Sequence, residues 1–205
     1  MLRMPERRTT NPRNPEDSIR AFFALWPDPS ASAALELLAC ETARRTQGRA
    51  PRSGNLHLTL VFVGEVAPTR VTALRAIGLV AASTAPPFPL TLDRSGTFRG
   101  SGVAWAGASA TPRELGELAQ QLRDALTAEG FSIEHREFQP HVTLARRCRR
   151  PGNGQIAAPI AWTVSRIVLN ASEPGSDGPR YRELASWPLG PRTADDHFGY
   201  AMGIV

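Results

Sequence analysis

The hydrophobic positions along the chain follow two kinds of spacing. Apolar residues at every second position are typical of half-buried strands, and apolar residues three and four positions apart are typical of amphipathic helices. The first spacing, bounded by turn residues, predicts strands at 19–26, 56–64, 131–135, 139–147, 161–172 and 181–189, with two or three more within 85–109. The second spacing predicts helices at 31–45, 68–82 and 112–129.

Capping signals mark the ends of two of these helices. A serine in the segment PDPSAS stands where the N-cap of the first helix is expected. Thr111 is followed by a proline and, three positions later, by Glu114, an order typical of a helix N-terminus. Gly130 is typical of the residue that ends a helix.

The same patterns set the limits of the folded domain. A length of 205 residues fits one domain, and 41% hydrophobic residues suffice for a sizeable core. Residues 1–17 are polar, rich in Pro and Arg, and without apolar periodicity, so we expect a disordered tail there. Residues 191–205 carry too little pattern to place and form a second tail. The domain is therefore predicted to span 18–190.

Composition excludes several classes of protein. No apolar run reaches the ~20 residues that span a bilayer, and the first residues lack the apolar core of a secretory signal. Two cysteines, Cys40 and Cys148, are too few for a disulfide framework or a multi-cysteine zinc site. We therefore expect a cytoplasmic protein with reduced thiols, without membrane contact, metal or cofactor. No surface apolar repeat indicates assembly, so we expect a monomer.

The charge balance favours a phosphorylated partner. All 24 basic residues are arginine, and they exceed the acidic residues by five. A basic surface raises the local concentration of phosphorylated ligands, and the arginine side chain binds phosphate through a planar fork of donors. The composition is compatible with a nucleic-acid partner but does not by itself identify one.

The most informative feature is an internal repeat. LHLTL at 56–60 and PHVTL at 140–144 share the order His, apolar, Thr, Leu, and 84 positions separate His57 from His141. This separation is too long for a solenoid repeat. It predicts two similar lobes of strands and helices that face each other across a cleft.

Strand geometry gives the repeat a chemical meaning. His57 and Thr59 point to one face of their strand, as do His141 and Thr143 of theirs, while the residues between them point into the core. One imidazole can then accept a proton while the other donates one, as hydrolysis of a cyclic phosphate requires. The threonine hydroxyls, helped by a guanidinium, can stabilise charge on the phosphoryl oxygens. No metal is needed for this chemistry.

These segments resemble the two-histidine (2H) phosphoesterase superfamily, and most of all its RNA 2′,3′-cyclic phosphodiesterases, historically called 2′-5′ RNA ligases. Besides the two motifs, IRAFFALWP resembles the family's opening strand, VAWAG its central strand and GPRYRELASWPL its closing strand. The resemblance covers roughly 18–190. It implies an α+β fold with two pseudo-symmetric lobes of antiparallel strands, helices packed outside and an active site in a central cleft. It also implies hydrolysis of an RNA terminal 2′,3′-cyclic phosphate, or of a cyclic nucleotide, to a 2′-phosphate.

The resemblance also implies roles for individual residues. His57 matches the general acid on the 3′-oxygen, and His141 matches the base that activates water. Thr59, Thr143 and Arg146 match phosphate-binding positions. Strict alternation places Arg146 on the face opposite to His141, so its strand must twist or bulge if the guanidinium is to reach the phosphate.

Other residues carry weaker signals. Phe138, three positions before His141, is a candidate for stacking on a terminal base, with core packing as the equal alternative. Tyr181 matches a family position. Arg147, Arg149 and Arg150 fit solvated loop positions or RNA phosphate contacts. His135 and His197 lack the motif. Three tryptophans are expected in the core: Trp105, Trp162 and Trp187.

Three alternative functions use the same residues. The site could act on another nucleotide, such as a cyclic phosphate on ADP-ribose or a 2′-5′ oligonucleotide, with ligation as the reverse reaction. A non-catalytic RNA- or nucleotide-binding module would keep the cleft, although retention of both histidines and both threonines favours catalysis. A zinc site on the two histidines lacks a third ligand.

Overall fold

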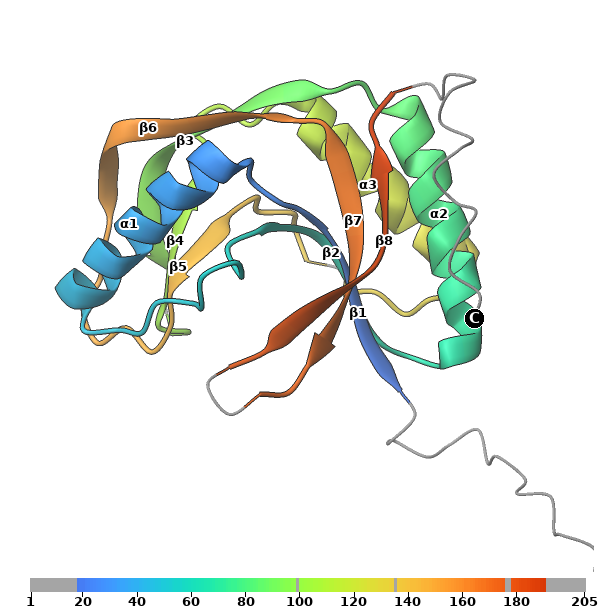
Figure 1. The fold of residues 1–205 in the computed structure, drawn as a ribbon, viewed down its shortest axis with the longest axis horizontal. Helices are drawn as coiled ribbons and strands as arrows, with labels where there is room; N and C mark the ends of the chain where they lie inside the picture. Colours follow the sequence, from blue (N-terminus) through green and yellow to red (C-terminus); the bar gives the residue numbers. More distant parts are fainter. Residues whose placement is uncertain (1–17, 99, 135, 176–177, 191–205) are drawn as a thin grey trace, which may run out of the picture.

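The chain folds into eight strands and three α-helices in the computed structural model, which describes residues 18–98, 100–134, 136–175 and 178–190 (Figure 1). The predicted tails, 1–17 and 191–205, lie outside the described residues. The elements in chain order are β1 (Ile19–Leu25), α1 (Pro29–Thr46), β2 (Leu58–Val66), the 3₁₀ turn η2 (Pro68–Arg70), α2 (Val71–Thr84), β3 (Phe88–Phe98), β4 (Val103–Gly107), α3 (Arg113–Ala128), β5 (Val142–Ala145), β6 (Gly154–Val164), β7 (Arg166–Glu173) and β8 (Arg180–Pro188).

All eight strands belong to one antiparallel sheet with the order β6-β3-β4-β5-β2-β1-β7-β8. Its two four-stranded halves meet at β5 and β2, the strands that carry the repeated motifs. Within the described residues these two strands pair at one position, Leu58 with Val142. The predicted α+β class with two antiparallel lobes is confirmed, and the lobes are halves of a continuous sheet.

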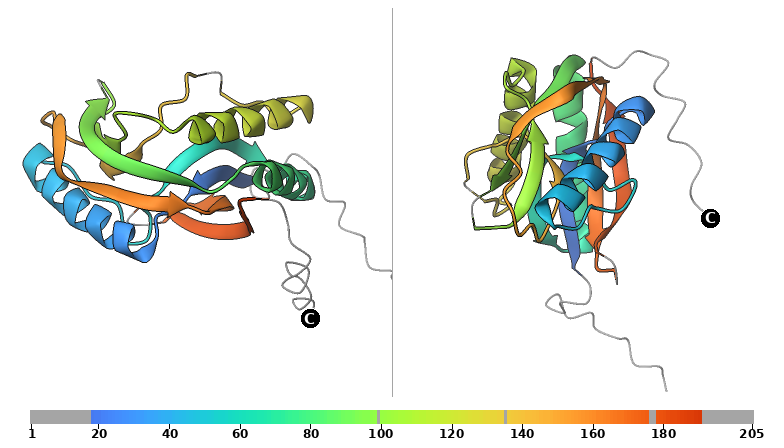
Figure 2. Two further views of the ribbon diagram at one scale, coloured as in Figure 1. Left: turned by 90° about the horizontal axis from the view of Figure 1, so that it is seen from above. Right: turned by 90° about the vertical axis from the view of Figure 1, so that its left-hand side faces the viewer.

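Two of the helices connect the two halves of the sheet. α1 follows β1 in the chain but packs on β5 and β6, whereas α3 follows β4 but packs on β2 and on α2. α2 packs on β7 and β8. Figures 1 and 2 show α1 at the opposite end of the molecule from α2 and α3. Each half of the sheet is therefore covered in part by a helix that follows a strand of the other half. Within the described residues, no helix is long and apolar enough to cross a membrane.

The segment formed by β6 and β7 also links the halves. β6 pairs with β3 in one half and β7 pairs with β1 and β8 in the other, yet only Ser165 separates the two strands. The sequence prediction of one strand at 161–172 was wrong here, because the hydrophobic alternation continues across the junction. One residue extends the chain by at most about 3.6 Å, so the sheet must curve until its edge strand β6 meets β7.

The core explains why the predicted elements form. α3 buries Leu115, Leu118, Leu122 and Leu126, spaced three and four residues apart, so that one stripe of the helix faces the sheet. The residues between and after the motif side chains are also buried: Leu58, Leu60, Val142 and Leu144 are at most 2% exposed. Burial of these leucines and valine fixes the register of both motif strands, because a slip by one residue would turn them to solvent.

Three local predictions were wrong. The N-cap of α1 is Asp28 and not a serine: its Oδ1 accepts a hydrogen bond from the Ala31 N–H at 2.8 Å, and Pro29 begins the helix. Thr111 does not cap α3, which has Pro112 at its N-cap and no capping side chain. Residues 131–134 are not a strand. Phe131 and Ile133 are buried against the core, which produces strand-like alternation without backbone pairing.

Candidate active site

The pairing of Leu58 with Val142 brings the two histidines together. His57 and His141 each directly precede one member of this pair. In an antiparallel register, the position of His57 then lies opposite that of Thr143, and the position of Thr59 opposite that of His141. Successive same-face residues on a strand are about 7 Å apart, which leaves room for one phosphate among the four side chains. All four line one cavity of about 700 Å³.

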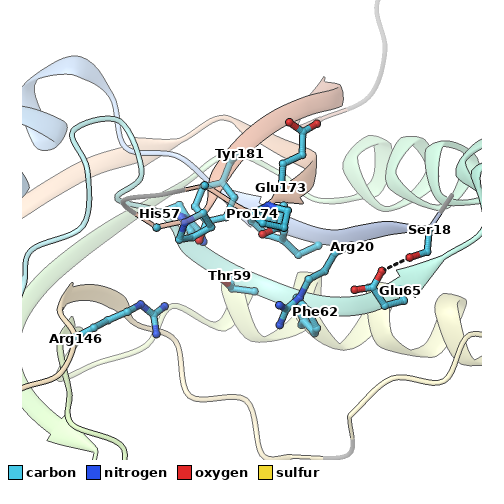
Figure 3. Close-up of a pocket in the computed structure, with 15 residues that line it drawn as sticks. Ser18, Arg20, His57, Thr59, Phe62, Glu65, Arg146, Glu173, Pro174 and Tyr181 are labelled. Atoms are coloured by element: carbon cyan, nitrogen blue, oxygen red, sulfur yellow. Dashed lines mark hydrogen bonds between the residues drawn. The ribbon is translucent and has the colours of Figure 1, made fainter. Parts of the chain in front are cut away.

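A β-bulge at the leucine of each motif turns later residues of the strand toward the cavity. In β5, Thr143 pairs with Trp105 and Ala145 with Ala104, so Leu144 is an extra residue. The inserted residue reverses the alternation, and Arg146 lines the same cavity as Thr143. The bulge resolves the conflict that strict alternation created for Arg146. Figure 3 shows its side chain extending toward Thr59.

The first motif has the same bulge. Thr59 pairs with Ala24 and Val61 with Phe23, which leaves Leu60 as the extra residue of β2. The third residue after the threonine is Phe62 within β2 and Arg146 directly after the end of β5. The two halves therefore share histidine, threonine and bulge, but place an aromatic ring and a guanidinium at equivalent positions.

Backbone carbonyls hold both imidazoles in one tautomer. His57 Nδ1 lies 2.8 Å from the Asn55 carbonyl oxygen, and His141 Nδ1 lies 2.7 Å from that of Gln139. Because a carbonyl only accepts hydrogen bonds, Nδ1 carries a proton and donates in both contacts. Nε2 is the ring nitrogen left to act on a ligand. In both motifs the acceptor is the residue two positions before the histidine, so the repeat extends to this hydrogen bond.

Aromatic rings fix the two imidazoles differently. His57 packs among Phe22, Trp26 and Tyr181, with ring centroids 5.0–5.2 Å from its own. The rings of His141 and Phe98 lie edge to face, with their centroids 4.8 Å apart. The Phe98 ring in turn packs on Trp105.

A glycine supports the rings beside His141. A Cβ on Gly96 would come within 2.2 Å of the Trp105 ring, so only glycine lets that ring lie against β3. Gly96 thereby leaves room for the Trp105 ring, which packs on Phe98, the neighbour of His141.

Burial and nearby positive charge lower the pKa of both imidazoles. Desolvation lowers the pKa of His57 from 6.5 to about 4, and the charges of Arg146 and His141 act in the same direction. Desolvation also lowers the pKa of His141, again helped by Arg146. Burial raises the pKa of Tyr181, which Arg146 opposes. Arg146 thus acts electrostatically on three groups of the cavity.

Arginines form one wall of this cavity: Arg49, Arg52, Arg146 and Arg147 line it, and no carboxylate does among the described residues. Arg49 and Arg146 are fixed by a pair of backbone hydrogen bonds, with N–O distances of 2.8 and 2.9 Å. Arg147 adopts a left-handed backbone conformation with φ 57°. The wall therefore concentrates positive charge beside both histidine motifs.

The structure brings most, but not all, of the singled-out residues to this site. Phe138 is partly buried against the core and lines neither of the two cavities beside His57. Trp162 and Trp187 are buried as expected, and Trp105 is half-buried. Arg149 and Arg150 are exposed, and their backbone N–H groups bond the Thr46 carbonyl. His135 and His197 lie outside the described residues.

Sequence reasoning missed Arg49 and Arg52, which it assigned to a loop before the first motif. Their position a few residues before the first histidine motif was the feature of the sequence that could have indicated a role in the site.

In the described part of the chain, no group of three His, Cys, Asp or Glu side chains is placed to hold a metal.

Comparisons with known proteins agree with this geometry. The family model of the 2′-5′ RNA ligase superfamily matches residues 27–173. The RNA 2′,3′-cyclic phosphodiesterase of Escherichia coli (strain K12) is 35% identical over 148 residues, covering 69% of this chain and 80% of that protein. Its namesake in Thermus thermophilus is 31% identical over 181 residues, 83% of this chain and 90% of that protein. The crystal structure of E. coli LigT complexed with 3′-AMP superposes with a TM-score of 0.76 and 31% identity, covering 84% of this chain and 98% of that one.

The low pKa of His57 predicts acid-sensitive folding. Between pH 6.5 and about 4 the unfolded chain protonates this residue while the folded protein does not. The unfolded state then binds more protons, so the free energy of unfolding falls as the pH falls, with about 3 kcal/mol from His57 at pH 4. Urea unfolding at several pH values should show that the free energy of unfolding of His57→Asn falls less between pH 6.5 and 4 than that of the wild type. Equal falls in the free energy of unfolding for the two proteins would contradict a lowered pKa of His57.

Proposed function

The chain belongs to the 2′-5′ RNA ligase superfamily, and we propose that it hydrolyses the 2′,3′-cyclic phosphate at an RNA end to a 2′-phosphate. One observation carries this proposal: two imidazoles on opposed motifs each present Nε2 to one arginine-walled cavity. The names of the E. coli and T. thermophilus relatives support it. A cytoplasmic location and a monomeric state are part of the proposal.

The reaction needs one proton donor and one proton acceptor. Nε2 of His141 removes a proton from a water molecule, whose oxygen attacks the phosphorus. The bond from phosphorus to the ribose 3′-oxygen breaks, and Nε2–H of His57 protonates that oxygen. The product carries a 2′-phosphate and a free 3′-hydroxyl. The proton gained by His141 and the proton lost by His57 are then exchanged with solvent before the next turnover.

The phosphate itself prepares His57 to act as the acid. With a pKa of about 4, His57 is neutral near pH 7 before a substrate binds. A bound phosphate anion offsets the charge of Arg146 and favours the protonated imidazole. The guanidinium of Arg146 and the hydroxyls of Thr59 and Thr143 stabilise charge on the non-bridging oxygens. Substrate binding and activation of the acid are thereby coupled.

The two-histidine mechanism predicts large and non-additive losses on mutation. Positioned proton transfer contributes ~10²–10⁴-fold, so His57→Ala and His141→Ala should each reduce kcat/KM by about that factor. The double variant should lose far less than the product of the two factors, because both residues act in one step. Thr59→Ala and Thr143→Ala should cost less. Kinetics on RNA with a 2′,3′-cyclic end measure this, with circular dichroism as the folding control. A folded histidine variant with near wild-type turnover would contradict the mechanism.

The substrate is identified by a panel of RNA with a 2′,3′-cyclic end, cyclic mononucleotides and 2′-5′ oligonucleotides. We expect a 2′-phosphate product, identified by ³¹P NMR. Predominant cleavage of 2′-5′ linkages would move the assignment to that alternative. Binding of nucleotides without turnover of any substrate would identify a binding module.

A second prediction concerns metals. Because the imidazoles supply both acid and base, turnover should survive EDTA with little change in rate. Loss of nearly all activity in EDTA, restored by one divalent ion, would refute this mechanism.

A third prediction concerns the arginine wall. If it holds the RNA backbone, KM for an oligonucleotide should rise with salt more steeply than KM for a cyclic mononucleotide. Arg49→Gln and Arg147→Gln should reduce this difference. Arg113→Gln, an exposed arginine of α3 outside the cavity, removes the same charge and should leave it unchanged. Equal salt dependence for both substrates in the wild type would show that only the terminal phosphate is bound.

A further inference from the structure

Asn55, two residues before His57, makes hydrogen bonds to three separate groups of the chain. Its backbone N–H donates to the Arg52 carbonyl at 3.0 Å, and its carbonyl accepts the hydrogen bond from Nδ1 of His57 at 2.8 Å. Its side-chain Nδ2–H donates to the carbonyl of Pro179 at 2.8 Å, across 124 positions of the chain. The residue that orients His57 is therefore itself attached to a distant segment.

That distant segment also contacts the ring of His57. Pro179 directly precedes β8, and Tyr181 is the second residue of this strand. The rings of Tyr181 and His57 lie edge to face, with centroids 5.0 Å apart and an interplanar angle of 86° (Figure 3). β8 pairs with β7, which pairs with β1 in the sheet. The start of β8 thus supports His57 twice, once at the ring and once at the acceptor of Nδ1.

The second motif lacks this attachment. Gln139 occupies the position that corresponds to Asn55, and its carbonyl also accepts a hydrogen bond from the histidine, His141. Its side chain is exposed to solvent and makes no hydrogen bond within the described part of the chain. The repeat therefore includes the backbone carbonyl that orients each histidine, whereas the side-chain bond belongs to His57 alone.

The bond between Asn55 and Pro179 is exposed to solvent. Water competes for both of its groups, so the bond adds little to the free energy of unfolding. Its consequence is geometric, because the peptide group that carries the acceptor carbonyl begins at the α-carbon of Asn55. An anchored side chain limits the rotation of that peptide group and keeps its oxygen in line with Nδ1.

The proposed acid needs this acceptor more than the proposed base does. To donate a proton from Nε2, His57 must carry protons on both ring nitrogens. Burial lowers the pKa of His57, and the hydrogen bond to the Asn55 carbonyl opposes this effect by favouring the protonated ring. A carbonyl that turned away would leave the imidazolium without its partner at Nδ1.

We infer that the side chain of Asn55 is a positioning residue for the general acid: its bond to Pro179 holds the Asn55 carbonyl against Nδ1 of His57. This inference rests on the proposed function. The start of β8, although far along the chain, then takes part in proton donation through Asn55.

Kinetics on RNA with a 2′,3′-cyclic end test the inference first. Asn55→Ala should lower kcat by about 2- to 12-fold, the factor that corresponds to one hydrogen bond. KM should stay within about twofold, because the bond acts on the acid and not on the bound substrate. Asn55→Gln keeps a side-chain amide and should recover part of kcat. Ser53→Ala is the matched control, since it removes an exposed hydrogen bond from the same loop to Glu36 of α1 and should leave kcat unchanged.

Ring ¹⁵N NMR with adenosine 2′-phosphate bound provides a readout that a merely structural role would not move. In Asn55→Ala, the pKa of His57 should be lower than in the wild type, and the neutral ring should lose part of its Nδ1–H form. The pKa and tautomer of His141 should stay as in the wild type, which makes this histidine an internal control. If Asn55→Ala does not fold by circular dichroism, Asn55→Ser replaces it in both experiments.

The outcomes separate this inference from the proposed function. Wild-type kcat in Asn55→Ala, a rise in KM alone, or an equal loss of kcat in Ser53→Ala would overturn the positioning role. If the wild type turns over no cyclic phosphate, the proposed function fails, and the NMR titration decides the role of Asn55 alone. A lower pKa of His57 with His141 unchanged would support it, and identical His57 titrations in Asn55→Ala and the wild type would overturn it.

Discussion

One backbone pairing, Leu58 with Val142, determines the geometry of the site. It is the position at which the two halves of the sheet join through their motif strands, and each histidine directly precedes it. Because both paired side chains are fully buried, the register cannot slip without exposing apolar surface. The crossing helices and the β6–β7 junction hold the halves on either side of this pairing. The fold thereby fixes the relative positions of two imidazoles that come from distant parts of the chain.

The two halves repeat a scaffold but not a function. Each supplies a histidine oriented by a carbonyl two residues earlier, a threonine, and a leucine at a bulge. The repeat ends at the third residue after the threonine, where Arg146 and Phe62 differ. In the proposed mechanism, the duplicated geometry supplies one histidine as the acid and the other as the base.

Sequence alone predicted what depends on local periodicity. The motif strands and their inward leucines followed from alternation, and the histidines and threonines followed from the repeat. Contacts made by tertiary packing were not predictable. The chain passes from one half to the other at Ser165 within an unbroken strand-like pattern, and Phe131 and Ile133 alternate only because both face the core. Arg49 and Arg52 reach the cavity from a loop whose path no periodicity encodes. Arg146 required a bulge, which strict alternation argues against.

The central claim is that a phosphate between the two histidines changes their protonation. Ring ¹⁵N NMR of the wild type measures this directly, because it reports both tautomer and pKa for each histidine. In the free protein we expect the Nδ1–H form of both rings, with His57 titrating at about 4 and His141 below 6.5. With a nucleoside 2′-phosphate bound, both pKa values should rise, and His57 should gain a proton on Nε2. Identical titration curves with and without the nucleotide would contradict the account.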